Sequence, residues 1–238
     1  MNRLVKLQLR NIFHNKLFYV CLGISLLINI GVTYVSEIIA KTPTSTTAMT
    51  AVISQFTSGV DIIGMVFITI FCTFDFSEGT TKNIIARGYT KTQLLFSKYI
   101  ASLIGILTMI LLMSVLSFIL YIKNGLGFEA NMGNQFIVAL FSILAYTVFY
   151  GTIAFTLEKT SSAIIANMFA PNIFALILGL ADSNLKVNMT KYWISNVGTT
   201  FSNSPTLTNM TFPIIMYIIY IVVFSFIGIY IAKNKEIK

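Results

Sequence analysis

Charged side chains are scarce in this sequence. Only 10% of its 238 residues are Asp, Glu, Lys or Arg, whereas 56% are hydrophobic. A typical soluble domain is about 25% charged and about 45–50% apolar. The composition therefore excludes an ordinary soluble domain and indicates an integral membrane protein.

Cysteine and histidine are almost absent. The chain has two cysteines, Cys21 and Cys72, and one histidine, His14. Both cysteines lie in apolar segments near the side that we argue below to be cytoplasmic, where disulfides are rare, so we expect free thiols that pack as small side chains. A lone histidine with no Cys/His cluster predicts no metal site.

Motifs for catalysis are missing as well. Residues 151–160 (GTIAFTLEKT) end in Lys-Thr but lack the second glycine that a phosphate-binding loop has before its lysine. Ser, His and Asp are nowhere grouped in a way that indicates hydrolysis. No predicted span pairs an acid with another acid or a base within one helical turn in mid-membrane. We therefore expect no enzyme site and no cofactor in this chain, so the energy for any work comes from outside it.

The net charge of +8 does not indicate a nucleic-acid partner, because the basic residues are scattered among apolar segments and form no patch or known binding motif. Residues 1–16, by contrast, place polar side chains about one turn apart and apolar ones on another side. The polar set is Arg3, Lys6, Arg10 and His14. This pattern predicts an N-terminal amphipathic interfacial helix that lies on an anionic lipid membrane.

Six apolar runs are each long enough to cross the hydrocarbon core, which takes about 20 residues of helix. The sequence therefore predicts an all-α polytopic membrane protein with six transmembrane helices in a single domain over residues 1–238. The predicted spans are residues 17–39, 55–74, 99–122, 135–157, 161–180 and 212–231. Residues 181–211 are long for a connector, so we expect an extracellular segment that folds back on the outer face, with Tyr192 and Trp193 as interface anchors.

The basic residues fix the predicted orientation. If the N-terminus is inside, 12 of the 16 Lys and Arg residues fall on the inner side and 4 on the outer side. Cytoplasmic segments of membrane proteins carry such an excess of Lys and Arg. Both termini are therefore predicted to be cytoplasmic.

Residues 75–98, between the second and third spans, are rich in charge and predict a structured cytoplasmic elbow. Thr80 can cap the start of a short helix over residues 82–87, and Gly88 stands where a left-handed stop residue is wanted. The Thr-x-x-Gln spacing that begins at Thr90 is that of a capping box for the next helix. The elbow is predicted to be helix, sharp turn, helix.

Polar residues interrupt two of the predicted spans. Gln55 and Asp61 lie near the start of the second span, where the acid either faces water or a partner or sits at the outer interface. In the fifth span, Pro171 is expected to kink the helix, and the amides of Asn167 and Asn172 need partners if they are buried. Either this helix lines a hydrated path or the two amides cross-link neighbouring helices.

The chain resembles a type-2 ABC transporter permease in three features. It has six predicted spans with both ends inside, a basic amphipathic helix at the N-terminus, and an elbow of the form E-G-T…G-Y-T-K-x-Q…S-K. More narrowly, the chain resembles the small Gram-positive permeases that export or expel bacteriocins, lantibiotics and cytolytic peptides. Glu78, Gly79 and Thr80 match the end of that family's second helix, residues 82–87 its coupling helix, and Lys98 the lysine that opens its third helix. Where the family usually has a proline before an arginine, this chain has Gly-Tyr-Thr-Lys.

The resemblance implies a multi-pass subunit of the bacterial cell membrane that exports a peptide or other amphipathic substrate. Two copies of a separate ABC ATPase, which hold ATP and Mg, would bind the elbow, and a second permease chain would complete a homodimer or heterodimer. Closure of the ATPase pair would move the coupling helix as a rigid lever. We hypothesise that ATPase coupling involves Glu78, Gly79, Thr80, Lys82, Asn83, Arg87 and Gly88. The hypothesised translocation path involves Gln55, Asp61, Asn167 and Asn172.

Two other readings of the sequence compete with the exporter. A non-transporting membrane scaffold or sensor subunit would show no dependence on ATP, and its mid-membrane amides would only join helices. A secondary carrier driven by an ion gradient needs a titratable residue deep in a span. Only Glu37 and Asp61 are candidates for that role, and both lie near the outer end.

Overall fold

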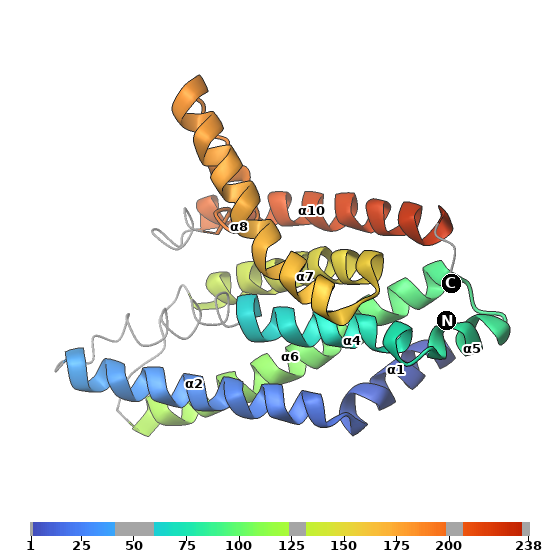
Figure 1. The fold of residues 1–238 in the computed structure, drawn as a ribbon. Coiled ribbons are helices and arrows are strands. Elements are labelled where there is room, and N and C mark those ends of the chain that lie inside the picture. The colour runs from blue at the N-terminus through green and yellow to red at the C-terminus, as the bar shows by residue number, and fades with distance from the viewer. Residues whose placement is uncertain (1, 41–59, 124–131, 199–206, 235–238) are drawn as a thin grey trace.

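The computed structural model describes residues 2–40, 60–123, 132–198 and 207–234, and in these ranges the regular secondary structure is entirely helical (Figure 1). The long helices are α1 (Asn2–His14), α2 (Lys16–Ala40), α4 (Met65–Ser77), α6 (Lys91–Lys123), α7 (Met132–Leu157), α8 (Thr160–Leu185) and α10 (Leu207–Asn234). Three short elements join them: the π-helix η1 (Val60–Gly64), the helix α5 (Thr80–Ala86) and the 3₁₀-helix η2 (Thr190–Tyr192). The prediction of an all-α fold is confirmed for the described residues.

Four helices, α6, α7, α8 and α10, are long and apolar enough to cross a membrane. Two bent pairs raise the number of candidates to six if each pair is one span. The first pair joins α1 to the start of α2 at 60°, and the second joins residues 62–77 to α5 at 70°. The chain is thus a helical membrane protein with four to six candidate spans, and the six-span topology stays a prediction.

A single side chain marks the bend between α1 and α2. The backbone N–H of Asn15 donates to the carbonyl of Ile12, and its side-chain oxygen accepts from the N–H of Leu17 at 2.9 Å. Asn15 thus stands between the two helices and satisfies a donor in the first turn of α2, as side chains at helix N-termini do. The basic amphipathic α1 and the apolar α2 therefore run in different directions, at 60° to each other.

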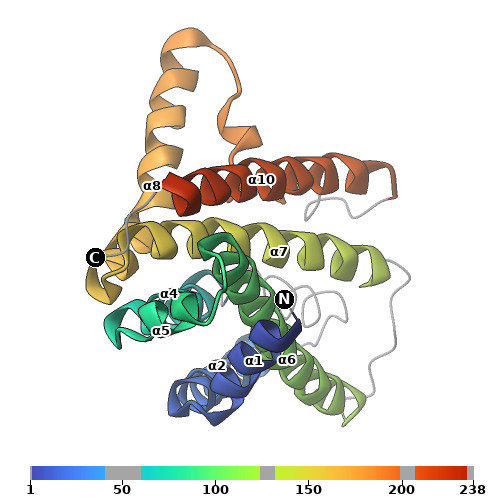
Figure 2. The same cartoon turned by 90° about the vertical axis from the view of Figure 1, so that its right-hand side faces the viewer.

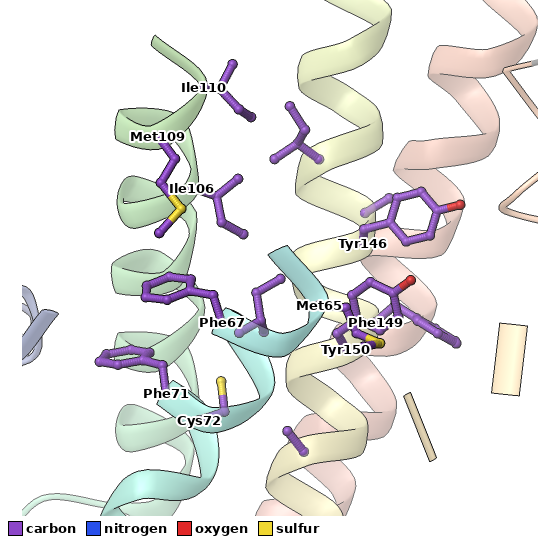
Figure 3. Packing of buried hydrophobic residues seen from close by; sticks show 14 of the residues in the cluster. Met65, Phe67, Phe71, Cys72, Ile106, Met109, Ile110, Tyr146, Phe149 and Tyr150 are labelled. Atoms are coloured by element: carbon purple, nitrogen blue, oxygen red, sulfur yellow. The ribbon is translucent and has the colours of Figure 1, made fainter. Parts of the chain in front are cut away.

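The core lies where α4 packs between α6 and α7 (Figure 3). The side chains that meet there are Met65, Phe67, Phe71 and Cys72 of α4, Ile106, Met109 and Ile110 of α6, and Tyr146, Phe149 and Tyr150 of α7. A glycine permits the close approach of α6 and α7, since a Cβ at Gly151 would lie 2.7 Å from the ring of Tyr99. Cys21 and Cys72 are buried free thiols, as expected.

Helices α8 and α10 form the periphery. α10 runs along α7, whereas α8 leans away from the other helices (Figures 1 and 2). α8 continues through Pro171 without a break in its helical assignment, and most of its apolar side chains beyond that residue are exposed. A helix of this composition with so little contact inside the protein has its apolar faces free for lipid or for another chain.

The segment after α8 folds back against the helices, as predicted. Trp193 is only 9% exposed, donates its indole N–H to the carbonyl of Pro171 at 2.9 Å and contacts the rings of Phe149, Phe174 and Tyr220. The expectation that Trp193 anchors the chain at the lipid interface is wrong, because its ring is packed inside the protein and its polar atom has a protein partner. Tyr192, beside it, remains exposed.

The start of α1, the end of α10 and α5 lie at one end of the molecule (Figures 1 and 2). This placement agrees with termini and elbow on one side of the membrane. We call it the elbow end.

Candidate functional site

A buried ion pair lies at the elbow end. The ammonium of Lys98, on α6, is 2.7 Å from Oδ2 of Asp75, on α4, and the two side chains are 1% and 4% exposed. Charged side chains are almost never this deeply buried unless they are paired. The pair joins α4 to α6 and closes the elbow, of which Asp75 and Lys98 are the first and last residues.

Hydrogen bonds extend the pair to two further helices. Gln8 of α1 donates its amide to Oδ2 of Asp75 at 2.9 Å, and Thr80 of α5 donates its hydroxyl to Oδ1 at 2.9 Å. Lys98 also donates to the carbonyl of Phe71 at 2.8 Å, and its ammonium lies 4.4 Å from the centre of that ring. We call Gln8, Asp75, Thr80 and Lys98 the elbow network. The network joins four helices, α1, α4, α5 and α6, through one residue of each.

Two left-handed glycines shape the elbow around this network. Gly79 has φ +66 between α4 and α5, and Gly88 has φ +87 just after α5. Residues with a Cβ rarely adopt such angles, so glycine is the residue that suits both turns. The prediction for Gly88 as a stop residue is confirmed.

The predicted capping interactions have different outcomes. The capping box is confirmed: the N–H of Thr90 donates to the side-chain oxygen of Gln93 at 3.0 Å, and the N–H of Gln93 donates to the hydroxyl of Thr90 at 3.2 Å. The prediction that Thr80 caps α5 is wrong. Its hydroxyl binds Asp75 instead, because the left-handed Gly79 occupies the capping position and Thr80 is already the first helical residue.

Helix α5 lies between two hollows. The larger, about 670 Å³, lies between α1, α4, α5 and α6, and Asp75 and Lys98 are part of its lining. The smaller, about 460 Å³, separates α5 from the turn between α7 and α8 and is lined by Lys82 and residues 158–161, among others. Between the hollows, α5 is held by the elbow network and by Ile84, which is buried in a hydrophobic cluster with Leu94 and Leu95 of α6.

The structure divides the seven predicted coupling residues. Thr80 belongs to the elbow network, and Gly79 and Gly88 shape the turns. The other four have exposed side chains: Glu78, Lys82, Asn83 and Arg87. Of these, Asn83 and Arg87 line the larger hollow, whereas Lys82 lines the smaller one, so the set covers two sides of α5.

The four predicted path residues are not brought together in the part of the chain that the structure describes. Gln55 lies outside the described residues, and Asp61 is described only by its backbone, in η1. Asn167 is fully buried, whereas Asn172 is exposed on α8 and its amide donates to the carbonyl of Met168, in its own helix.

Asn167 cross-links helices. Its amide donates to the hydroxyl of Thr69 on α4 at 2.7 Å and to the carbonyl of Tyr150 on α7 at 3.2 Å. One turn further along, the hydroxyls of Thr73 and Thr160 are 2.9 Å apart and join α4 to α8 again. Of the two readings left open for the amides, the cross-link holds for Asn167, and Asn172 joins no neighbouring helix.

The site predicted from the sequence lacks the centre of the elbow network: it does not include Gln8 or Asp75, and Lys98 enters only as a match to the lysine that opens the third helix of the similar family. A usable signal was present. An acid at the end of one apolar run and a base at the start of the next must approach each other when the runs form a hairpin. Burial and the link to α1 could not be read from the sequence, because Gln8 lies far away along the chain.

Comparison with known proteins gives a family and nothing more specific. A family model described as "Protein of unknown function (DUF2705)" matches residues 12–238. No curated protein and no solved structure matches the chain. The matched range includes Asp75, Thr80 and Lys98 and ends with the chain.

Proposed function

The chain belongs to the DUF2705 family of proteins of unknown function, and we propose that it is the membrane subunit of an ATP-driven type-2 ABC exporter that moves a peptide or other amphipathic substrate out of the cell or membrane. The observation that carries the proposal is the elbow network. It attaches a short helix with exposed charged residues to the ends of two long apolar helices.

The elbow network makes α5 suitable as a lever. Helix α5 has seven residues, and isolated helices shorter than about 12–15 residues are marginal in water. Its position therefore depends on its tertiary contacts: Ile84 packs in a hydrophobic cluster with residues of α6, and Thr80 is bound to Asp75, which is bound to Lys98. A push on α5 is passed to α4 and α6 together, which is how rigid elements transmit domain movement.

The charges on α5 supply the contact for a cytoplasmic ATPase. Lys82, in α5, and Arg87, just after it, are exposed, and so is Glu78, in the turn before α5. The excess of Lys and Arg on this side supports a cytoplasmic location for the elbow and both termini. In this proposal the chain is a six-span protein of a bacterial cell membrane, and two copies of an ATPase bring ATP and Mg.

A second permease chain would complete the path. Helix α8 leans away from the bundle with Asn172 exposed among apolar side chains, whereas Asn167 is used inside the protein. An exposed amide on an otherwise apolar helix favours contact with water or with another chain over contact with lipid. In the proposal, Gln55, Asp61 and Asn172 remain path residues and Asn167 is a structural cross-link.

The test is affinity purification of the tagged chain from its own membranes in mild detergent, followed by mass spectrometry and an ATPase assay. We expect a stoichiometric ATP-binding subunit with vanadate-sensitive turnover. The double variant Lys82→Ala/Arg87→Ala should lose most of that subunit. Lys233→Ala removes a positive charge at the same end of the molecule from another helix and should retain it. Equal retention in both variants would show that the elbow is not the contact.

One observation keeps the scaffold reading as a second candidate. That reading expects mid-membrane amides to join helices, and Asn167 does so. The same purification separates the two functions. If the chain is a scaffold, the purified sample contains no subunit that hydrolyses ATP.

A further inference from the structure

The larger hollow beside α5 has the features of a ligand site, and it shares two lining residues, Asn83 and Arg87, with the proposed ATPase contact. It occupies about 670 Å³, within the range of about 300–1,000 Å³ that is usual for small-molecule sites. Its lining includes His14, Asn15 and Lys16, where the amphipathic α1 meets α2, so it lies at the level of the predicted membrane surface. We call it the α1–α5 cavity.

The lining of the α1–α5 cavity carries excess positive charge. Lys16 of α2 and Arg87 at the end of α5 contribute cationic side chains from opposite sides. Among the described residues of the lining, Asp75 is the one acid, and Lys98 neutralises it. Lys16 and Arg87 are therefore left to attract an anion, and guanidinium and ammonium groups bind phosphate well.

One residue of the cavity lining, Gln8, also has a buried acceptor with no partner. Gln8 is fully buried, and while its amide N–H binds Asp75, its Oε1 has no hydrogen-bond partner in the structure. Buried polar atoms are nearly always hydrogen-bonded, so this oxygen is suited to accept from a hydroxyl or an amine of a ligand. The asparagines Asn11 and Asn83 supply further polar groups on the two walls.

Apolar side chains complete the lining. Leu7 of α1, Phe71 and Phe74 of α4, and Ile84 of α5 face the same space. A free inorganic anion gains no binding energy from apolar side chains. A lipid does, because its glycerol backbone and the start of its acyl chains bury apolar surface against them. The combination of cations, a hydroxyl acceptor and apolar walls at a membrane surface identifies one class of ligand.

We propose that the α1–α5 cavity binds the headgroup of an anionic phospholipid whose headgroup carries hydroxyls, as that of phosphatidylglycerol does. The phosphodiester lies between Lys16 and Arg87, and a headgroup hydroxyl donates to Oε1 of Gln8. The lipid thereby bridges the start of α2 and the end of α5. The proposal does not depend on an ATPase partner, so it stands or falls separately from the exporter function.

The test is titration of the detergent-solubilised full chain with phosphatidylglycerol or phosphatidylcholine, with bound lipid measured by native mass spectrometry. We expect one phosphatidylglycerol to bind at least about tenfold more tightly than phosphatidylcholine. Lys16→Gln/Arg87→Gln should weaken that binding about thirtyfold, since each basic residue near an anionic lipid contributes roughly a factor of five. The control Lys159→Gln/Lys233→Gln removes the same charge at the elbow end but outside this cavity, and binding should change less than twofold.

Three results would overturn the proposal. Equal binding of phosphatidylglycerol and phosphatidylcholine would show that the charge of the headgroup is not recognised. Equal losses of binding in the two double variants would show that the net charge of the protein, and not this cavity, attracts the lipid. Displacement of the lipid by an equal concentration of glycerol 3-phosphate shows a site for soluble phosphates instead of a lipid. Unchanged elution on size-exclusion chromatography and unchanged far-UV circular dichroism establish that the variants are folded.

Discussion

Neutralising Lys98 alone should destabilise the protein more than neutralising both members of its ion pair. Lys98→Met leaves the carboxylate of Asp75 buried with only the amide of Gln8 and the hydroxyl of Thr80 as donors. Removal of one partner of a buried pair costs about 3–5 kcal/mol, because the other charge is left uncompensated. We expect the free energy of unfolding to fall by about that amount. Asp75→Asn leaves a buried ammonium and should have a similar cost.

The double variant Asp75→Asn/Lys98→Met buries no charge. The new amide can donate to Oε1 of Gln8, which has no partner, and its oxygen can still accept from Thr80. Replacement of a buried ion pair by neutral groups of similar size is often close to neutral in stability. We expect the double variant to lie within about 1.5 kcal/mol of the wild type, so it should be more stable than either single variant.

The assay is unfolding by dodecyl sulfate in mixed micelles, followed by the fluorescence of Trp193 and by circular dichroism. Trp193 is the one tryptophan of the chain, and its ring is buried. Lys159→Met, at an exposed position, should change the free energy of unfolding by no more than about 0.5 kcal/mol. If the losses of the two single variants simply added in the double variant, the pair would not be coupled and the account of the elbow network would be wrong.

Three further predictions use the same unfolding assay. Gly88→Ala should cost about 1–2 kcal/mol because φ is +87 there, whereas Gly133→Ala, in a helix with open space around it, should cost nothing. Gly151→Ala should cost about 1–3 kcal/mol, since the new Cβ meets a tyrosine ring of α6 at 2.7 Å; a loss below about 0.5 kcal/mol would mean that α6 and α7 are not in close contact. Asn167→Ala should cost about 1–3 kcal/mol through its lost cross-links, and Asn172→Ala less than about 0.5 kcal/mol; equal losses would contradict the distinction between the two amides.

Local features of the elbow could be predicted from the sequence because each rests on residues close together in the chain. The capping box at Thr90 and the stop at Gly88 follow from spacing and from the conformational freedom of glycine. The long helices follow in the same way from the length of the apolar runs, although length and composition alone leave their number between four and six.

The two mispredicted residues, Thr80 and Trp193, each have a partner that their residue type does not reveal. Thr80 is a good capping residue by type, but a carboxylate one turn earlier competes for its hydroxyl. Trp193 has the residue type of an interface anchor, but the carbonyl of Pro171 and three aromatic rings hold it inside the protein. A competing local contact outweighs the preference of Thr80, and tertiary contacts outweigh that of Trp193, although both preferences are correct on average.

The elbow network explains why the residues that matter most for α5 need not be those on its surface. A seven-residue helix has too little stability of its own to carry force. Its position is fixed by the buried Ile84, by Thr80 and by the pair of Asp75 and Lys98, which also joins α4 to α6. In the proposed exporter, exposed charges such as Lys82 would decide what binds α5, whereas the network would decide whether movement of α5 reaches the membrane. If that proposal is right, changes at the surface abolish binding of the ATPase, and changes in the network leave it bound but uncouple its activity from transport.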